Sequence, residues 1–250
     1  MFQLNGKMAL VTGAATGLGQ AIASALAENG ADVAISDKPG VSLDETRGKC
    51  AAFGRKVFLF EMDVRDVAQI KTGVAAAEKE FGRIDVLVNN AGINRPMPGI
   101  DVTEENWDDH YATNVRGGFF TAQAVAPGMM KRGWGRVVWV SSQSGLIGIP
   151  GQPVYCSTKG AVVQLVRTLG VEWAKHGITV NSVAPTFVET NLTRKRLQNP
   201  DFLRFVLGKI PRGKLAEPRD VASAVVFLAS DEAGMVNGVN LPVDGGWTAW

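Results

Sequence analysis

The sequence predicts an α/β fold, a doubly wound parallel sheet with helices on both faces. Short apolar runs rich in β-branched residues recur along the chain, and longer stretches with helical spacing separate them. Strands that alternate with helices form right-handed βαβ units and so build a parallel sheet. The apolar runs also lack alternating polar residues, which is expected where helices cover both faces of a sheet.

The elements can be placed in order along the chain. The first strand leads into the stretch LGQAIASALAENG, where Ile22, Ala25 and Leu26 share one face of a helix. Two longer helices are expected later, around residues 103–130 and 153–175. The six predicted strands occupy residues 7–13, 31–36, 56–61, 84–90, 135–142 and 177–184.

One domain is expected to span residues 1–250, because no Pro/Ser-rich linker divides the chain. The segment 186–218 breaks the rhythm of strands and helices, since it is polar, is interrupted by prolines and follows the sixth strand. It should project from the carboxyl edge of the sheet, where ligands bind in open α/β sheets. We expect it to be a lid over a ligand site, with an ordinary surface excursion as the alternative.

Composition and charge exclude several classes of function. The chain has 46% apolar and 20% charged residues, a net charge of only +2, and no basic run longer than Arg194-Lys195-Arg196. These features do not indicate a nucleic-acid partner. Lys7 interrupts what would be the apolar core of a signal peptide, and no stretch approaches the roughly 20 apolar residues of a membrane span. We therefore expect a cytoplasmic protein without a membrane partner.

The cysteines and histidines are too few and too scattered for a metal site. Cys50 and Cys156 have no metal-ligand spacing with each other or with His110 and His176, the only histidines. The sequence thus predicts no metal and two free thiols, as is usual in a reducing compartment.

A glycine-rich turn, TGAATGLG, follows the first strand. Gly13, Gly17 and Gly19 lead into a helix, where the backbone must turn sharply and lie close to a pyrophosphate. The charge of the pyrophosphate would meet the amide groups and the positive end of the helix. Asp37 ends the second strand eighteen residues after Gly19, where a carboxylate accepts hydrogen bonds from the adenosine ribose of NAD. Together these residues predict a dinucleotide site.

Asp37 also favours NAD over NADP. A 2′-phosphate would lie against its carboxylate, and two unit charges about 4 Å apart repel by roughly 4 kcal/mol at an effective dielectric constant of about 20. Lys38 could pair with a phosphate, whereas Thr16 offers no positive charge in the glycine loop. NAD is therefore the expected cofactor, and NADP the less favoured one.

The glycine spacing T-G-x-x-x-G-x-G resembles that of the classical short-chain dehydrogenases/reductases. Further motifs match this family in the same order along the chain. These motifs are Asn89-Asn90-Ala91-Gly92, Asn114 in ATNVRG, Ser142 in VSSQSG, and Tyr155 with Lys159 in YCSTK. The resemblance covers essentially the whole chain. It implies a single-domain Rossmann fold and an NAD(P)-dependent alcohol dehydrogenase or carbonyl reductase, EC 1.1.1.-, that moves a hydride between a secondary alcohol and a ketone.

The pair Tyr155 and Lys159 has the chemistry that this reaction needs. Hydride transfer at a carbinol carbon requires a group that takes or gives the hydroxyl proton, and free tyrosine, with a pKa of about 10, is a poor base at neutral pH. The two side chains are an i, i+4 pair on one helix face. The ammonium group is therefore expected to favour the phenolate and to lower the pKa of Tyr155.

The resemblance assigns further roles. Lys159 would also bind the nicotinamide ribose, Ser142 would hold the substrate oxygen, and Asn114 would anchor a water in the proton relay. One departure stands out, because relatives usually have Pro-Gly where this chain has Pro185-Thr186, and the threonine is expected to shift the loop or narrow the site. The implied cofactor contacts are Gly13, Thr16, Gly17, Leu18, Gly19, Asp37, Asp63, Val64, Asn90, Ala91, Gly92, Tyr155, Lys159, Pro185, Val188 and Thr190.

The substrate is predicted less sharply. The segments NNAGINRPMPGIDVTEENWDD and VNGVNLPVDGGWTAW resemble those of bacterial members that act on sugar acids and polyols, such as gluconate 5-dehydrogenases and deoxygluconate dehydrogenases. Arg95 is a candidate for binding a carboxylate of the substrate, and the alternative is an ion pair with a nearby acid at the rim. The predicted substrate contacts are Arg95, Ser142, Gln143 and Tyr155.

Other interpretations stay open. A reductase of 3-oxoacyl thioesters is one, although Asp37 argues against it because that reaction normally uses NADPH. A non-catalytic dinucleotide-binding sensor or scaffold is another, although it would be expected to lose part of the catalytic set. The resemblance also implies a homotetramer with contacts through the two long helices and the C-terminal GGWTAW. A pocket for a hydrophobic ketone or aryl alcohol could be lined by Phe187, Leu192, Phe202, Phe205 and Val206.

Overall fold

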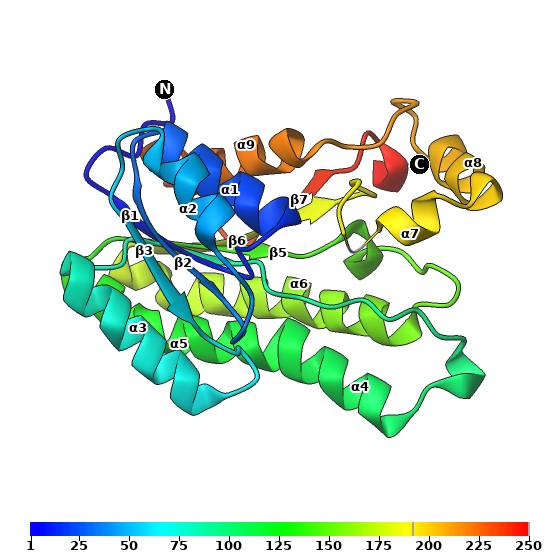
Figure 1. The fold of residues 1–250 in the computed structure, drawn as a ribbon, viewed down its shortest axis with the longest axis horizontal. Helices are drawn as coiled ribbons and strands as arrows, with labels where there is room; N and C mark the ends of the chain where they lie inside the picture. The colour runs from blue at the N-terminus through cyan, green and yellow to red at the C-terminus, as the bar shows by residue number, and fades with distance from the viewer. Residues whose placement is uncertain (192, 250) are drawn as a thin grey trace.

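A computed structural model describes residues 1–191 and 193–249 of the chain. It contains a seven-stranded, all-parallel sheet with strand order β3-β2-β1-β4-β5-β6-β7 (Figure 1), which confirms the predicted fold class. The strands are β1 (Met8–Thr12), β2 (Asp32–Asp37), β3 (Val57–Glu61), β4 (Val86–Asn89), β5 (Gly135–Val140), β6 (Ile178–Pro185) and β7 (Asn240–Val243).

Helices cover both faces of the sheet, and each face has its own apolar core. On one face α1 (Gly17–Glu28), α2 (Asp44–Ala51) and α9 (Pro218–Ala229) pack together (Figure 1), and residues such as Val11 of β1 point into that core. On the other face α3 (Val67–Phe81), α5 (Gly118–Arg132) and α6 (Pro153–Trp173) cover Leu10 and its neighbours. Successive residues of β1 thus enter opposite cores, which explains the strands' continuous apolar character.

The site is positioned by the order of the strands. β1 pairs with β2 on one side and with β4 on the other, so the chain reverses its direction of winding between β1 and β4. A crevice opens at the carboxyl ends of the strands at such a switch point. Val11 of β1, Val88 of β4 and Val138 of β5 are register partners, so the loops after these three strands leave the sheet side by side.

Two elements differ from the sequence prediction. β7, which the sequence did not predict, is a four-residue edge strand that contains Pro242 and pairs with β6. A strand this short that contains proline cannot be recognised from its apolar pattern. The long helix expected around residues 103–130 is α4 (Glu104–Tyr111) and α5, joined by the π-helical turn η2 (Ala112–Gly117). A π-turn has no signature in apolar periodicity.

The segment 186–218 includes two short helices, α7 (Arg194–Leu197) and α8 (Pro200–Lys209), which lie beside the C-terminal residues (Figure 1). Val206, Ile210 and Trp247 form a small apolar core there. Two positions weighed in the sequence, Leu192 and Trp250 of the C-terminal GGWTAW, lie outside the described residues. Single-turn 3₁₀ helices are η1 (Gly99–Asp101), η3 (Gln143–Gly145), η4 (Ala174–His176), η5 (Asp231–Ala233) and η6 (Trp247–Ala249).

Within the described residues no helix is long and apolar enough to cross a membrane. The same part of the chain holds no group of three or more His, Cys, Asp or Glu side chains arranged to bind a metal.

Candidate active site

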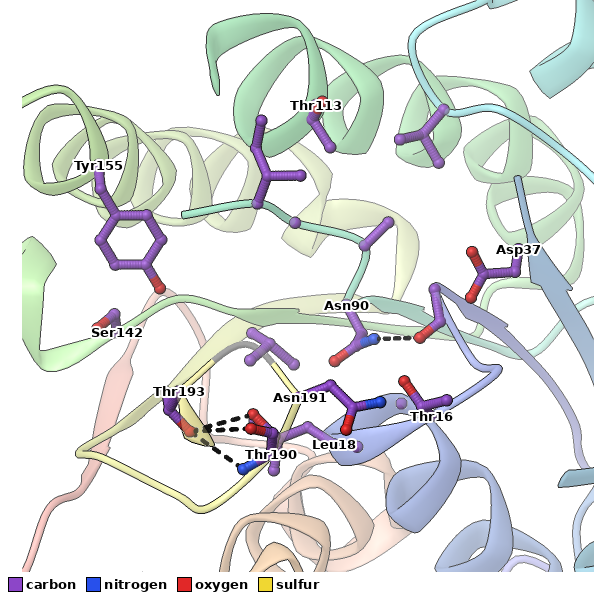
Figure 2. Close-up of a pocket in the computed structure, with 18 of the residues that line it drawn as sticks. Thr16, Leu18, Asp37, Asn90, Thr113, Ser142, Tyr155, Thr190, Asn191 and Thr193 are labelled. Carbon is purple, nitrogen blue, oxygen red and sulfur yellow. Dashed lines mark hydrogen bonds between the residues drawn. The ribbon is translucent and has the colours of Figure 1, made fainter. Parts of the chain in front are cut away.

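A cavity of about 410 Å³ opens at the carboxyl edge of the sheet, at the switch point between β1 and β4 (Figure 2). Every cofactor contact implied by the sequence lines it, and so do Ser142 and Arg95. Asn114 and Gln143 do not line it: Asn114 lies behind the wall, in η2, and Gln143 is buried in η3. The fold therefore gathers into one crevice residues from six loops that are far apart in the sequence.

The glycine loop is packed too tightly for side chains. Gly13 has a φ of +64°, and a Cβ added to it would lie 2.8 Å from the Cα of Ala91. A Cβ on Gly19 would collide with the carbonyl oxygen of Gly13 and lie 2.5 Å from Nδ2 of Asn90. Backbone rather than side chains thus forms the floor of the cavity, which is the surface that a pyrophosphate requires.

The loops after β1 and β4 are tied together. Asn90 donates from Nδ2 to the carbonyl oxygens of Thr12 and Gly13, both at 2.9 Å. The Thr12 hydroxyl accepts from the backbone amides of Asn90 and Ala91, both at 3.2 Å. These bonds fix the position of the glycine loop, which leads into the first turn of α1. The N-cap residue of α1 is Thr16, and its side chain makes no capping hydrogen bond. The amides of that turn are left for an anionic ligand.

Asp37 lies at the end of β2, on the cavity wall (Figure 2). Its Oδ2 accepts from the amide of Ala15 in the glycine loop at 3.0 Å, and its Oδ1 accepts from the amide of Lys38 at 2.9 Å. The carboxylate is therefore held at a fixed position beside the loop that would carry the phosphates.

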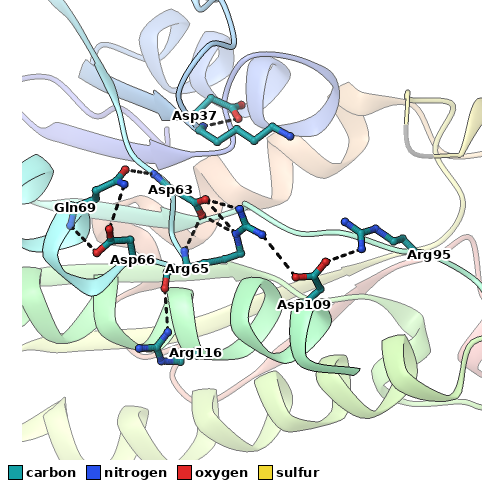
Figure 3. A network of polar contacts seen from close by, with 9 residues as sticks. Asp37, Asp63, Arg65, Asp66, Gln69, Arg95, Asp109 and Arg116 are labelled. Atoms are coloured by element: carbon teal, nitrogen blue, oxygen red, sulfur yellow. Dashed lines mark hydrogen bonds and ion pairs between the residues drawn. The ribbon is translucent and has the colours of Figure 1, made fainter. Parts of the chain in front are cut away.

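A chain of ion pairs follows the rim of the cavity (Figure 3). Arg65 forms a two-pronged pair with Asp63, with Nη2 2.7 Å from Oδ2, and its Nη1 lies 3.6 Å from Oδ1 of Asp109. Asp109 in turn accepts from Nη1 of Arg95 at 2.6 Å. The hydrogen bond from Arg65 lowers the pKa of Asp63, and the pKa of Arg65 is raised in return. Of the two roles weighed for Arg95, the structure contains the rim ion pair.

Tyr155 and Ser142 lie close together on the wall of the cavity. Tyr155 comes from the first turn of α6, and Ser142 follows β5; Figure 2 shows the Tyr155 hydroxyl directed toward Ser142. Burial raises the pKa of Tyr155 to about 12, a rise that a hydrogen bond with Ser142 partly opposes. A neutral phenol and a serine hydroxyl thus stand together, as is needed to hold and protonate an oxygen atom.

The direction of this pKa shift differs from the sequence expectation. Lys159 Nζ donates to the carbonyl oxygen of Val140 at 2.8 Å and lies 5.5 Å from the centre of the Tyr155 ring, while burial lowers the pKa of Lys159 to about 8. Burial is the leading cause of both shifts, since desolvation disfavours the charged form of each group. The expectation that Lys159 lowers the pKa of Tyr155 is therefore wrong for this structure.

Asn114 is fixed behind the cavity by three bonds. It exchanges hydrogen bonds with the backbone of Ile93, at 2.8 Å to the amide and 2.9 Å to the carbonyl oxygen, and donates to Oγ1 of Thr158 at 3.2 Å. A Cβ added to Gly92 would lie 3.3 Å from Oδ1 of Asn114 and 3.7 Å from Nζ of Lys159. Asn114 and Lys159 therefore flank Gly92 from two helices, and the π-turn η2 sets the position of Asn114.

Thr186 fits without the backbone conformation that would require glycine. Among the described residues the only non-glycine with a positive φ is Phe2. Thr186 lines the cavity, its amide donates to Val243 of β7 at 3.1 Å, and its hydroxyl, buried, has no partner within the described residues.

Several lining residues were not predicted from the sequence. Arg65 and Asp109 have no local pattern, because they meet only when α4 folds against the loop after β3. Thr193 of the lid segment is another, and it donates to the carbonyl oxygen of Val188. The remaining unpredicted lining residues are Met62, Ile93, Thr113, Val140, Ser141 and Asn191.

Comparison with known proteins agrees with this geometry. A family model described as enoyl-(acyl carrier protein) reductase matches residues 13–248. The gluconate 5-dehydrogenase of Gluconobacter oxydans is 38% identical over 248 residues, which cover 99% of this chain and 97% of that protein. The D-threitol dehydrogenase of Mycolicibacterium smegmatis is 40% identical over 249 residues, 99% of this chain and 95% of that protein.

A solved structure is also closely similar. It is described as a putative 2-deoxy-D-gluconate 3-dehydrogenase of Agrobacterium tumefaciens with bound NADP. Its TM-score is 0.92, and it is 37% identical over 100% of this chain and 99% of that one. Full-length matches at this identity extend through the glycine loop, the Tyr-Lys pair and the lid segment alike. The chain belongs to the short-chain dehydrogenase/reductase family and is an NAD(P)-dependent dehydrogenase of the EC 1.1.1.- class.

Proposed function

We propose that this oxidoreductase interconverts a secondary alcohol and a ketone on a polyol, a sugar or a sugar acid, with NAD as its cofactor. The observation that carries the proposal is that the Tyr155 and Ser142 hydroxyls lie close together on the wall of the dinucleotide cavity (Figure 2). The two hydroxyls offer a proton and a hydrogen bond to the same small oxygen atom.

The residues present fit a dinucleotide. Side chains are excluded at Gly13 and Gly19, and the first turn of α1 offers amide groups to a pyrophosphate. When bound, the cofactor accepts a hydride from the carbinol carbon during oxidation or donates one to the carbonyl carbon during reduction.

Four side chains of the protein have proposed roles. Tyr155, a neutral phenol in this site, gives its proton to the carbonyl oxygen in reduction and receives it in oxidation. Ser142 holds that oxygen. Lys159, whose ammonium is directed at the carbonyl of Val140, positions the cofactor ribose and supplies positive charge near the phenol. Asn114 anchors the relay that returns the proton to solvent.

The position of Asp37 supports NAD over NADP. Its carboxylate is fixed by Ala15 and Lys38, so it cannot easily turn away from a 2′-phosphate. Repulsion of roughly 4 kcal/mol at about 4 Å would then oppose NADP. Lys38 and Arg65 also line the cavity, but Arg65 is engaged with Asp63. NADP is bound in the Agrobacterium relative, so the preference is a property proposed for this chain in particular.

The substrate class rests on relatives and on the full catalytic set. Gluconate and D-threitol, which name two relatives, are both polyhydroxylated. A relative that is 40% identical is named a 3-oxoacyl-[acyl-carrier-protein] reductase, which makes a 3-oxoacyl thioester the second candidate. The aromatic lid residues Phe187, Phe202 and Phe205 support a hydrophobic ketone. A non-catalytic sensor is disfavoured because Asn114, Ser142, Tyr155 and Lys159 are all present.

One screen tests the proposal. Absorbance of the reduced nicotinamide is followed with NAD and with NADP against polyols, sugar acids, simple secondary alcohols and a 3-oxoacyl thioester. We expect turnover of a polyol or sugar acid with NAD, and a loss of at least about 100-fold in Tyr155→Phe. Wild-type and Tyr155→Phe proteins that both bind NADH and are equally inactive on the whole panel would instead indicate a sensor.

We also propose that the protein works in the cytoplasm as a homotetramer. Large apolar side chains are exposed on the long helices, and they support contacts with other subunits; Trp107 of α4 is 46% exposed and Val171 of α6 is 81% exposed. Native mass measurement would give the subunit count, and cell fractionation the compartment. As one domain, residues 1–250 would unfold in a single cooperative transition.

A further inference from the structure

A second cavity, of about 290 Å³, lies between the lid helix α8 and the loop 147–150. That loop belongs to the segment that joins Ser142 to Tyr155 in the chain, so the two groups proposed to hold the reacting oxygen stand at the two ends of the segment that forms one wall of the second cavity. The other walls are Phe205 and Lys209 of α8 and Trp247 near the C-terminus. The cavity is therefore placed to hold the part of a substrate that lies away from the reacting carbon.

Its walls are apolar and aromatic. The ring of Trp247 stacks against Phe187 with centroids 5.9 Å apart and meets Phe205 edge-on at 6.3 Å. Trp247 is 7% exposed, whereas Phe205 is 44% exposed and borders the opening. Rings held in this way present a fixed surface to the C–H groups of a carbon chain, as is common in ligand pockets.

Lys209 is the charged group of this cavity. It is exposed, ends α8, and makes no ion pair within the described part of the chain, whereas Arg204 of the same helix pairs with Asp201 at 3.1 Å. The other candidate for an anionic substrate group, Arg95, is already paired with Asp109 at 2.6 Å. The alternative is a purely structural role for Lys209, since a cation in the last turn stabilises the carbonyl groups of a helix end.

We propose that Lys209 binds the carboxylate of the substrate, while Trp247 and Phe205 pack against its carbon chain. The substrate is then a polyhydroxylated acid. Its secondary hydroxyl binds at Ser142 and Tyr155, and its carboxylate binds at Lys209 of α8. This assignment rests on the proposed function and narrows it from polyols in general to hydroxy acids.

The test compares gluconate with glucitol, which has the same six-carbon chain with a neutral CH₂OH in place of the carboxylate. In Lys209→Gln we expect the KM for gluconate to rise about 10- to 100-fold, because this is the effect of losing one hydrogen bond to a charged group. The KM for glucitol should change less than about twofold. Lys209→Arg should restore most of the loss. Arg204→Gln, on the same helix, is the matched control and should change neither KM. Added salt should raise the KM for gluconate alone.

Binding without turnover separates this inference from the proposed function. Gluconate is titrated calorimetrically into NAD-loaded Tyr155→Phe protein, and into the same protein with Lys209→Gln added; we expect the second to bind at least about tenfold more weakly. Equal affinity, or no binding of gluconate in either, overturns the assignment of Lys209 whatever the enzyme turns over. Binding that depends on Lys209, together with no oxidation of any hydroxy acid or polyol, would support the binding site and contradict the proposed reaction. A lower melting temperature of Lys209→Gln with unchanged gluconate affinity would indicate the structural role instead.

Discussion

The Asp37 carboxylate accepts a hydrogen bond from the backbone amide of Ala15, with 3.0 Å between Oδ2 and the nitrogen, so a residue at the end of β2 holds the glycine loop that follows β1. The Asp37 side chain thereby holds the glycine loop in place and also puts a negative charge beside that loop. The contact therefore links the form of the loop to the proposed choice of NAD over NADP.

Replacing Asp37 by Asn should weaken the proposed NAD preference without collapsing the loop. The amide oxygen of Asn can still accept from Ala15, but it no longer repels a 2′-phosphate. We expect the ratio of kcat/KM for NAD to that for NADP to fall about 100-fold, less than the full repulsion of about 4 kcal/mol because solvent screens part of it. Initial rates with both cofactors measure this ratio. A wild-type enzyme that already prefers NADP would contradict the argument.

Arg95→Gln should have little effect on substrate binding. The guanidinium of Arg95 is engaged by Asp109, so we expect the KM for gluconate to change less than about threefold, as for an exposed ion pair. Lys209→Gln, assayed in parallel, provides the contrast. A tenfold rise in the gluconate KM with the glucitol KM unchanged would mean that Arg95 leaves Asp109 to bind the carboxylate.

Ketone reduction should decline above about pH 8. Burial lowers the pKa of Lys159 to about 8, so its ammonium is present below that pH and is lost above it, whereas Tyr155, with a pKa raised to about 12, keeps its proton throughout. We expect kcat/KM for reduction to be flat below pH 8 and to fall by about tenfold per pH unit beyond it. In Lys159→Arg, which stays charged, the decline should move above pH 10. A wild-type profile that is flat to pH 10 would rule out this role of the charge.

Cys50 should be unreactive in the folded protein and should make stability depend on pH. The side chain is fully buried, and burial raises the pKa of its thiol from 9.0 to about 11. Between these values the unfolded chain loses the thiol proton while the folded chain keeps it, so the free energy of unfolding should fall as pH rises through this window. Urea unfolding from pH 8 to 11 measures the slope, and Cys50→Ala should reduce it. Alkylation of Cys50 at pH 8 without denaturant would contradict the burial.

Much of the fold could be predicted because the apolar pattern expresses it directly. The six strands from β1 to β6 lie within a few residues of their predicted positions, since a strand buried on both faces needs a continuous apolar run. β7 and the π-turn η2 could not be predicted. The four residues of β7 are a strand only because β6 offers a free edge, and η2 replaces a regular helix where Asn114 meets Ile93.

The predicted site residues fall into two groups. Those that lie beside a strand end, such as Gly13, Asp37 and Ser142, were identified from their position after a predicted strand, and they line one cavity. Gln143 illustrates the limit: its place next to Ser142 suggested a substrate contact, but its side chain is 2% exposed, and both of its amide atoms lack a partner within the described residues. Sequence neighbours at a turn point in different directions, and only the fold decides which of them faces the ligand.

By itself, the sequence determined the parallel sheet and the glycine loop, and it predicted the set of reacting groups, because these depend on local patterns of apolar residues, glycine and short-range spacing. Only the tertiary structure decided the electrostatics. Burial moved the pKa of Tyr155 upward, Asp109 engaged Arg95, and the packing of α8 against Trp247 set Lys209 beside an aromatic cavity. Desolvation and pairing between charges depend on distances between residues that are remote in the chain, and these distances exist only after folding.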